Sequence, residues 1–194
     1  MKTSIETIRR RELSEAAFEV MKEHGLPGTT VARVAERAGM SQGLVHHYFK
    51  GKSDMLEGAI WQVTKTFRQR IVDAVCSTDD PEIRLHALIE ALYPADHFDV
   101  PMAQAWLSSC GEAAFNEAYA RLQRVMFNRM QSNFAYHLRD FLEPEAARRA
   151  ARMLCMQSHG IWLRCAIDRD GISRDDALRQ MKELLATLIG RPAP

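Results

Sequence analysis

Apolar residues recur every three or four positions along most of the chain, and the strict alternation typical of strands is hard to find. This spacing predicts helices over residues 5–24, 31–38, 41–49, 54–77, 81–92, 100–109, 112–142, 144–167 and 173–189. Side-chain oxygens suited to cap helix N-termini stand at Thr29 or Thr30, Ser41 and Ser53. We therefore expect an all-α protein of about nine helices.

Glycines and prolines cluster between residues 25 and 51, which predicts short helices joined by tight connections. Two such helices meet at Gly39, as in a helix-turn-helix. Ala35 and Ala38 are small enough to let the helices approach closely, and Val45 and Phe49 share one face of the second helix. The outward side then presents groups able to read a DNA major groove, namely Gln42, Gly43, Leu44, His46, His47 and Tyr48. An αα-hairpin without any DNA contact predicts the same spacing.

The overall charge of the 194-residue chain is close to neutral, with 26 Lys and Arg against 25 Asp and Glu. This balance excludes a polycation and an acidic disordered chain. Up to residue 52, nine basic residues stand against six acidic ones, so a modest positive surplus lies at this end. No uncharged stretch exceeds 12 residues, whereas a membrane-spanning helix needs roughly 20 apolar residues. With no apolar signal segment at the start, we expect a cytoplasmic, nucleoid-associated protein without a membrane partner.

The four cysteines, Cys76, Cys110, Cys155 and Cys165, lack the spacing of a zinc site or a disulfide framework. They are interpreted as thiols packed within helices. Cys155 and His159 share a helix face, but two ligands do not make a zinc site. No nucleophile–base arrangement or phosphate-binding loop is recognisable. We expect no metal, no cofactor and no enzymatic activity; a helical module for a protein partner stays open as an alternative.

The segment from Thr30 to Leu56 combines a threonine, an apolar-alanine pair, Ala38-Gly39-Met40-Ser41, Tyr48-Phe49, Lys52 and a final leucine. In this order the residues resemble the DNA-binding region of the tetracycline-repressor (TetR) family, over about residues 8–68. The resemblance implies a three-helix helix-turn-helix DNA-binding domain at residues 1–52. It also implies a helical effector-binding and dimerisation domain at residues 53–194, and a repressor that binds double-stranded operator DNA.

Roles for individual residues follow from this resemblance. It places Gln42 and Leu44 at base edges, where glutamine pairs with adenine and leucine meets a thymine methyl group. Gly43 lets the helix approach the DNA backbone closely, and His46 stands where the family often has a tyrosine. Arg9, in the run at residues 9–11, either adds positive charge toward the DNA or belongs to a solvated helix face. Phosphate contacts are implied for Thr30, Ser41, His47, Tyr48 and Lys52.

Residues 4–13, 43–49, 105–107 and 160–164 are similar to the choline-responsive (Bet-type) repressors of glycine betaine synthesis within this family. This similarity implies repression that choline relieves. A quaternary ammonium binds to aromatic faces, and the candidate walls are Phe67, Tyr93, Phe98, Trp106 and Trp162. Alternatively, these aromatics are ordinary core residues. The effector is alternatively a fatty acyl group, a drug-like aromatic or another quaternary amine. Cys110 and His159 stand where an aromatic and an acidic residue are expected.

The resemblance also implies a homodimer built by the last two helices. Apolar candidates for the interface are Leu154, Ile161, Leu184, Leu185, Leu188 and Ile189. A two-fold dimer sets its recognition helices one DNA turn apart, roughly 34–36 Å, and reads a palindrome. Effector binding is then expected to move the fourth helix and to spread these two recognition helices.

Overall fold

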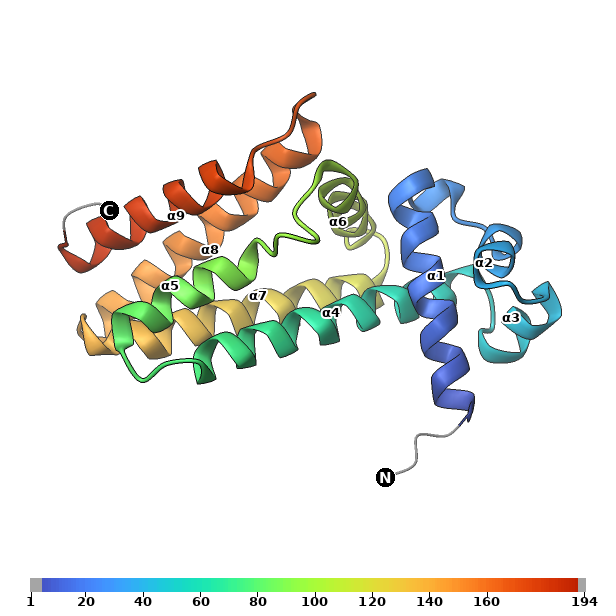
Figure 1. The fold of residues 1–194 in the computed structure, drawn as a ribbon, viewed down its shortest axis with the longest axis horizontal. Coiled ribbons are helices and arrows are strands. Elements are labelled where there is room, and N and C mark those ends of the chain that lie inside the picture. Colours follow the sequence, from blue (N-terminus) through green and yellow to red (C-terminus); the bar gives the residue numbers. More distant parts are fainter. Residues whose placement is uncertain (1–4, 192–194) are drawn as a thin grey trace. The chain divides into compact units, whose positions relative to one another are not determined.

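A computed structural model describes residues 5–191. Residues 1–4 and 192–194 lie outside the description, including Ser4, the first residue of the similarity predicted over 4–13. The described residues form nine α-helices and one 3-10 helix, with no strand (Figure 1). The prediction of an all-α protein of about nine helices is confirmed. The elements are α1 Ile5–Gly28, α2 Val31–Ala38, α3 Gln42–Tyr48, α4 Lys52–Cys76, α5 Pro81–Leu92, α6 Val100–Glu112, α7 Glu117–His137, η1 Leu138–Asp140, α8 Pro144–Ile167 and α9 Arg174–Ile189.

The chain divides into two compact units. The first comprises the residues up to Thr66 together with Gln104–Ala120, and the second comprises Phe67–Ala103 and the residues from Arg121 onward. Within this division, α4 begins at Lys52 and continues to Cys76 without interruption. The helices α4, α6 and α7 therefore contribute residues to both units.

In the first unit, α1, α2 and α3 pack against one another around buried apolar side chains. The connection between α2 and α3 depends on Gly39, whose φ of 63° is left-handed and disfavours any residue with a side chain. Its N–H reaches back to the carbonyls of α2 and so closes that helix. Thr30 and Ser41 accept backbone N–H groups as the N-caps of α2 and α3, as predicted.

Several helix boundaries differ from the prediction, and two of these differences have a visible local cause. Ser53 is not an N-cap, because α4 begins at Lys52 and the Asp54 carboxylate accepts the Lys50 N–H at 2.9 Å instead. The expected helix over 112–142 is divided, since residues 113–116 form a turn and α7 begins at Glu117. The Asn116 side-chain oxygen accepts the Ala118 N–H at 3.0 Å and satisfies one of the first amides of α7.

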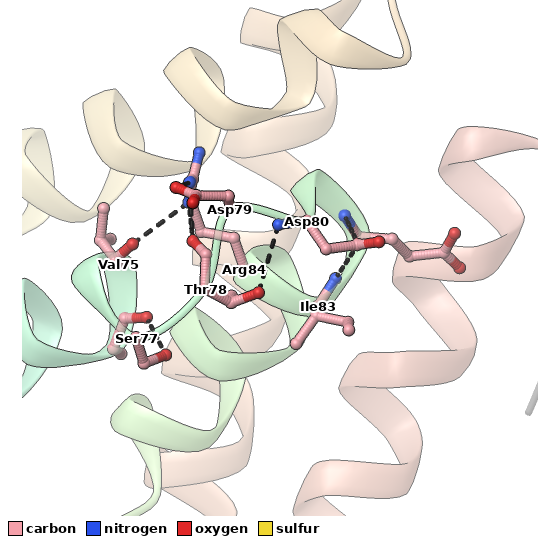
Figure 2. A network of polar contacts seen from close by, with 9 residues as sticks. Val75, Ser77, Thr78, Asp79, Asp80, Ile83 and Arg84 are labelled. Carbon is pink, nitrogen blue, oxygen red and sulfur yellow. Dashed lines mark hydrogen bonds and ion pairs between the residues drawn. The ribbon is translucent and has the colours of Figure 1, made fainter.

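The second unit has a core made by α5, α7, α8 and α9 together with the end of α4. In Figure 1, α8 and α9 lie side by side, and α9 also packs on α5. Figure 2 shows how Arg84 of α5 fixes the end of α4: its Nε donates to the Val75 and Thr78 carbonyls at 3.1 Å each. Asp80 caps α5 by accepting the amides of residues 82 and 83.

The four cysteines are free thiols in different environments. Cys155 and Cys165 are buried within α8, Cys110 is half-buried, and Cys76 is exposed at the last residue of α4. Burial raises the pKa of Cys110 to about 11 and that of Cys155 to about 12. Within the described range, no three His, Cys, Asp or Glu residues are grouped as a metal site, and no helix is long and apolar enough to cross a membrane.

Candidate functional site

The helix α3 has one buried side and one open side. Val45 is fully buried and Phe49, just after the helix, is only 2% exposed, so the predicted packing face is confirmed. The open side carries several of the predicted DNA-reading residues: Gln42, Gly43, His46 and His47 are exposed, and Leu44 and Tyr48 are half-buried. The His47 and Tyr48 rings meet edge to face at 5.0 Å. This short helix therefore offers polar, aromatic and small groups on a single accessible surface.

Gly43 is a glycine that the fold itself does not require. A Cβ placed there meets only the Ser41 hydroxyl oxygen, at 3.9 Å, which is an ordinary contact distance. The backbone of Gly43 also lies outside the left-handed region. Internal packing therefore gives no reason for glycine at this position on the open side of α3.

Arg10 holds the end of α3 in place, a role that sequence reasoning missed. Its Nη1 donates to the Tyr48 carbonyl at 2.9 Å, and its Nη2 lies 3.3 Å from Oδ1 of Asp54. The guanidinium carbon lies 4.6 Å from the centre of the Phe49 ring, close enough for a cation–π contact. These partners are about forty residues away along the chain, so no local pattern could have signalled them.

Arg9 and Lys52, two further basic residues with a predicted DNA contact, make fewer contacts than Arg10. Arg9 pairs with Glu12 of its own helix at 2.8 Å, and its side chain is 48% exposed. Lys52 is exposed and donates to the Pro27 carbonyl at 2.8 Å. Because these contacts use exposed groups, both cations can exchange them for a phosphate at little cost.

In the second unit, three of the predicted effector residues come together. The Tyr93 ring lies edge to face with Phe98 at 5.1 Å and stacks with Trp162 at 6.4 Å, and Phe98 meets Trp162 edge to face at 5.0 Å. We call these three residues the aromatic cluster. They come from the end of α5, the connection to α6, and α8.

Tyr93 combines full burial with an unsatisfied hydroxyl. Its Oη is enclosed and makes no hydrogen bond of ordinary geometry, although Ser158 lies near enough to influence its ionisation. Burial is the main cause that raises the pKa of this phenol well above its usual value of 10. A buried phenol without a partner is costly, so a ligand atom that completes its hydrogen bond gains affinity.

The remaining effector candidates lie elsewhere. Phe67 packs against the core of the second unit, and Trp106 belongs to the first unit, where it is half-buried. His159 faces Phe127, with 5.3 Å between the ring centres. Burial lowers the pKa of His159 and favours its neutral form, so this position supplies no negative charge.

The predicted dimer residues have different environments in one protomer. Leu154, Ile161 and Leu185 are at most 2% exposed and belong to its own core. Leu184, Leu188 and Ile189 are partly buried against the same core. The large apolar side chains that α8 exposes are instead Met153, Met156, Leu163 and Ile167.

Comparison with known proteins decides the family. Residues 13–59 match the bacterial regulatory proteins of the tetR family, and residues 81–190 match the BetI-type transcriptional repressor C-terminal family. The second match alone covers more than half of the chain. The chain belongs to the TetR family, with a BetI-type C-terminal domain.

Relatives of this TetR-family chain are similar over nearly their whole length. The regulator BetI of Pseudomonas paraeruginosa is 31% identical over 179 residues, 91% of both chains. BetI of Paraburkholderia phymatum is 32% identical over 197 residues, which cover 99% of this chain and 98% of the relative. Both are named as transcriptional regulators, in agreement with the interpretation of this chain as a regulator and not an enzyme.

A solved structure shares the fold. A transcriptional regulator from Saccharomonospora viridis, in complex with choline, superposes with a TM-score of 0.83 at 21% identity and covers 92% of this chain and 96% of its own. This likeness shows that the two proteins share their fold.

Proposed function

We propose that this chain represses genes for the conversion of choline to glycine betaine, and that choline releases it from a palindromic operator. The observation that carries the proposal is the match of residues 81–190 to the BetI-type C-terminal family. The structural relative with choline bound supports the choice of effector. Operator binding and choline binding would use different residues of the chain.

The open side of α3 would read the operator. Gln42 can donate to and accept from one adenine, and the half-buried Leu44 can meet a thymine methyl group. Gly43, which internal packing does not require, would let the helix backbone approach the sugar-phosphate chain. His46 lies on the same exposed side. Phosphate contacts would come from Arg9, Thr30, Ser41, His47, Tyr48 and Lys52.

The aromatic cluster would bind the trimethylammonium group. This cation has no N–H to donate, so the faces of aromatic rings recognise it better than a polar acceptor does. Three rings within 5.0–6.4 Å of one another supply such surfaces, and the enclosed Tyr93 hydroxyl can pair with the choline hydroxyl. Phe67, which packs against the core of the same unit, is proposed as a further wall.

A second copy of the chain would cover the exposed stripe on α8. Met153, Met156, Leu163 and Ile167 are 41–56% exposed and lie at helical spacing within one narrow arc. Gly160 falls in the same arc, and a Cβ there meets no atom within 4 Å, so a facing helix can come close. Apolar groups concentrated on one surface are typical of an interface. The half-buried Leu184 and Leu188 of α9 would extend this interface.

Operator binding tests the proposal most directly. We expect the chain to bind DNA from upstream of its own gene specifically, with affinity that falls steeply as salt rises. Saturating choline should weaken this binding by roughly 5–150-fold, the usual range for coupled sites. Glycine betaine serves as the control ligand, because it keeps the quaternary ammonium and lacks the hydroxyl. Specific DNA binding that ignores choline contradicts the choline assignment, and absence of specific binding favours a protein-partner module.

A different effector is the second candidate. The half-buried Cys110 and the neutral His159 stand where an aromatic and an acidic residue are expected, and both changes weaken the case for a cation. Thermal unfolding separates the two candidates, because a ligand at 100 times its Kd stabilises the folded state by about 2.7 kcal/mol. Stabilisation by a fatty acid or an aromatic drug, and none by millimolar choline, would favour a regulator of another pathway.

A further inference from the structure

The connection between α5 and α6 carries two rings of the aromatic cluster on a compact turn. Tyr93 begins this segment and Phe98 lies near its end. Within it, the amides of His97 and Phe98 both donate to the Pro94 carbonyl, at 3.0 and 2.8 Å. These hydrogen bonds fold the segment on itself, and we expect it to move as one piece. We call residues 93–99 the aromatic loop.

An ion pair joins the aromatic loop to α4. Arg70 of α4 donates from Nη1 to Oδ1 of Asp96 at 2.8 Å, and from Nη2 to Oδ2 at 2.7 Å. Two parallel bonds fix the plane of the guanidinium relative to the carboxylate, so the pair constrains orientation as well as distance. The Arg70 guanidinium lowers the pKa of Asp96 to about 2, and the pair therefore stays ionised at neutral pH. His97 Nδ1 lies 2.9 Å from the same carboxylate.

The opposite side of the aromatic loop is attached to other helices of the second unit. Arg174 of α9 donates to the Tyr93 carbonyl at 2.6 Å, which holds the beginning of the loop. Trp162 of α8 contacts Phe98 near the loop's end through their rings. A ligand that separates these rings must therefore displace Phe98 and its neighbours, while the backbone at Tyr93 stays attached to α9.

From this geometry we infer that the Arg70–Asp96 pair transmits the presence of effector from the aromatic loop to α4. The inference rests on the proposed function, in which effector binds at the aromatic cluster. Asp96 lies two residues before Phe98 and follows its displacement, and Arg70 passes that displacement into α4. Because α4 is continuous from Lys52 onward, only three residues separate its first turn from the end of α3. Arg70 and Asp96 are thus positioning residues that touch neither effector nor DNA.

Removal of this pair should uncouple choline binding from operator binding and leave each of the two intact. The Asp96 side chain is 61% exposed, and such pairs contribute little to folding stability. Arg70→Gln should therefore keep choline affinity and effector-free operator affinity within about threefold of the native values. The ratio of operator Kd with choline to operator Kd without it should fall roughly fivefold. The charge swap Arg70→Asp with Asp96→Arg should restore most of this ratio.

The control is another pair in the same unit with similar exposure. Lys182 of α9 contacts Glu90 of α5 at 2.8 Å, and its side chain is 27% exposed, against 28% for Arg70. Lys182→Gln should keep the full ratio of operator affinities. Calorimetry measures choline binding, and fluorescence anisotropy measures operator binding. An Arg70→Gln variant that binds choline and still releases the operator as the native chain does would overturn the inference.

Hydrogen exchange tests the link without any ligand, which separates failure of the inference from failure of the choline assignment. If the native chain does not respond to choline, the proposed function is wrong in its effector. The inference still requires that Arg70→Gln increase amide exchange several-fold in both the aromatic loop and residues 68–74 of α4, more than Lys182→Gln does. Equal exchange in the two variants would contradict it.

Discussion

Replacement of Arg10 by methionine tests whether this cation positions α3 or contacts DNA. Methionine keeps much of the aliphatic stem and removes the guanidinium. The change deletes the hydrogen bond to the Tyr48 carbonyl, the contact with Asp54 and the cation–π contact with Phe49. All three partners lie at the end of α3 or the start of α4, so the end of the recognition helix loses its attachment to α1.

The cost can be estimated from the separate contacts. A cation–π contact at an exposed site contributes about 0.5–1 kcal/mol. A charge-assisted hydrogen bond to a carbonyl contributes roughly 1 kcal/mol when, as here, the side chain is 48% exposed. The longer contact with Asp54, at 3.3 Å, adds at most a few tenths of a kcal/mol. The expected loss is about 1.5–2 kcal/mol, which lowers Tm by roughly 3–8 °C for a chain of this size.

Arg9→Met provides a matched control, because both side chains are 48% exposed and Arg9 pairs only with Glu12 among the contacts described here. Arg10→Met should lower Tm and weaken operator binding roughly threefold to tenfold at every salt concentration, since it moves the reading surface without removing a phosphate contact. Arg9→Met should leave Tm within about 2 °C and reduce the slope of log affinity against log salt by about 0.9. If Arg10→Met reduces that slope and leaves Tm unchanged, Arg10 contacts phosphate and our reasoning is wrong.

Three further changes probe the other sites. Gly43→Ala should raise Tm by about 1–4 °C, because alanine favours a helix by about 0.5–1 kcal/mol and only Ser41 lies near the added methyl group. It should nevertheless weaken operator binding about tenfold in a gel shift. Met156→Asp places an unpaired charge on the exposed stripe of α8, so it should shift sedimentation from dimer to monomer and weaken association roughly 100-fold or more. The control Tyr136→Asp, at an exposed position of α7, should leave sedimentation unchanged. Burial first, and a nearby arginine second, lower the pKa of His137 below 6.5, so folding favours the neutral ring. The stability that this neutral ring contributes is complete above pH 6.5 and is lost as the pH falls. The urea midpoint of unfolding should therefore drop less between pH 7.5 and pH 5.5 in His137→Gln than in the native chain.

Local signals were sufficient where a helix ends on a residue with special geometry. The bounds of α2, α5 and α8 agree with the prediction, because Gly39 closes α2 and a proline stands at the first position of the other two. The turn at residues 113–116 contains neither glycine nor proline, and its local signal was Asn116, a residue type suited to cap the helix that follows. At α4, Ser53 was a sound candidate cap, but the chain satisfies the Lys50 amide through Asp54 instead. Where α4 begins therefore depends on a tertiary contact, because Arg10 of α1 lies against Asp54.

The candidate site shows the same limit. Residue type and spacing identified the open side of α3, since buried and exposed positions alternate there at helical period. The identity of aromatic residues suggested Tyr93, Phe98 and Trp162, but their grouping depends on how α5 and α8 pack. For α8, apolar periodicity could not tell the face that packs inside the protomer from the face left exposed. Leu154 and Met153 are neighbours in sequence, yet one is buried and the other is half exposed.

The four thiols differ in burial, so one of them should react with thiol reagents faster than the others. Maleimides attack the thiolate, so a buried thiol with a raised pKa, such as Cys155, reacts slowly at neutral pH. Cys165 is 1% exposed, and the pKa of Cys110 is raised to about 11, whereas Cys76 is exposed at the end of α4. A fluorophore added to the native chain therefore attaches first at Cys76. It would report movements of the helix that begins just after the recognition helix, without a single substitution.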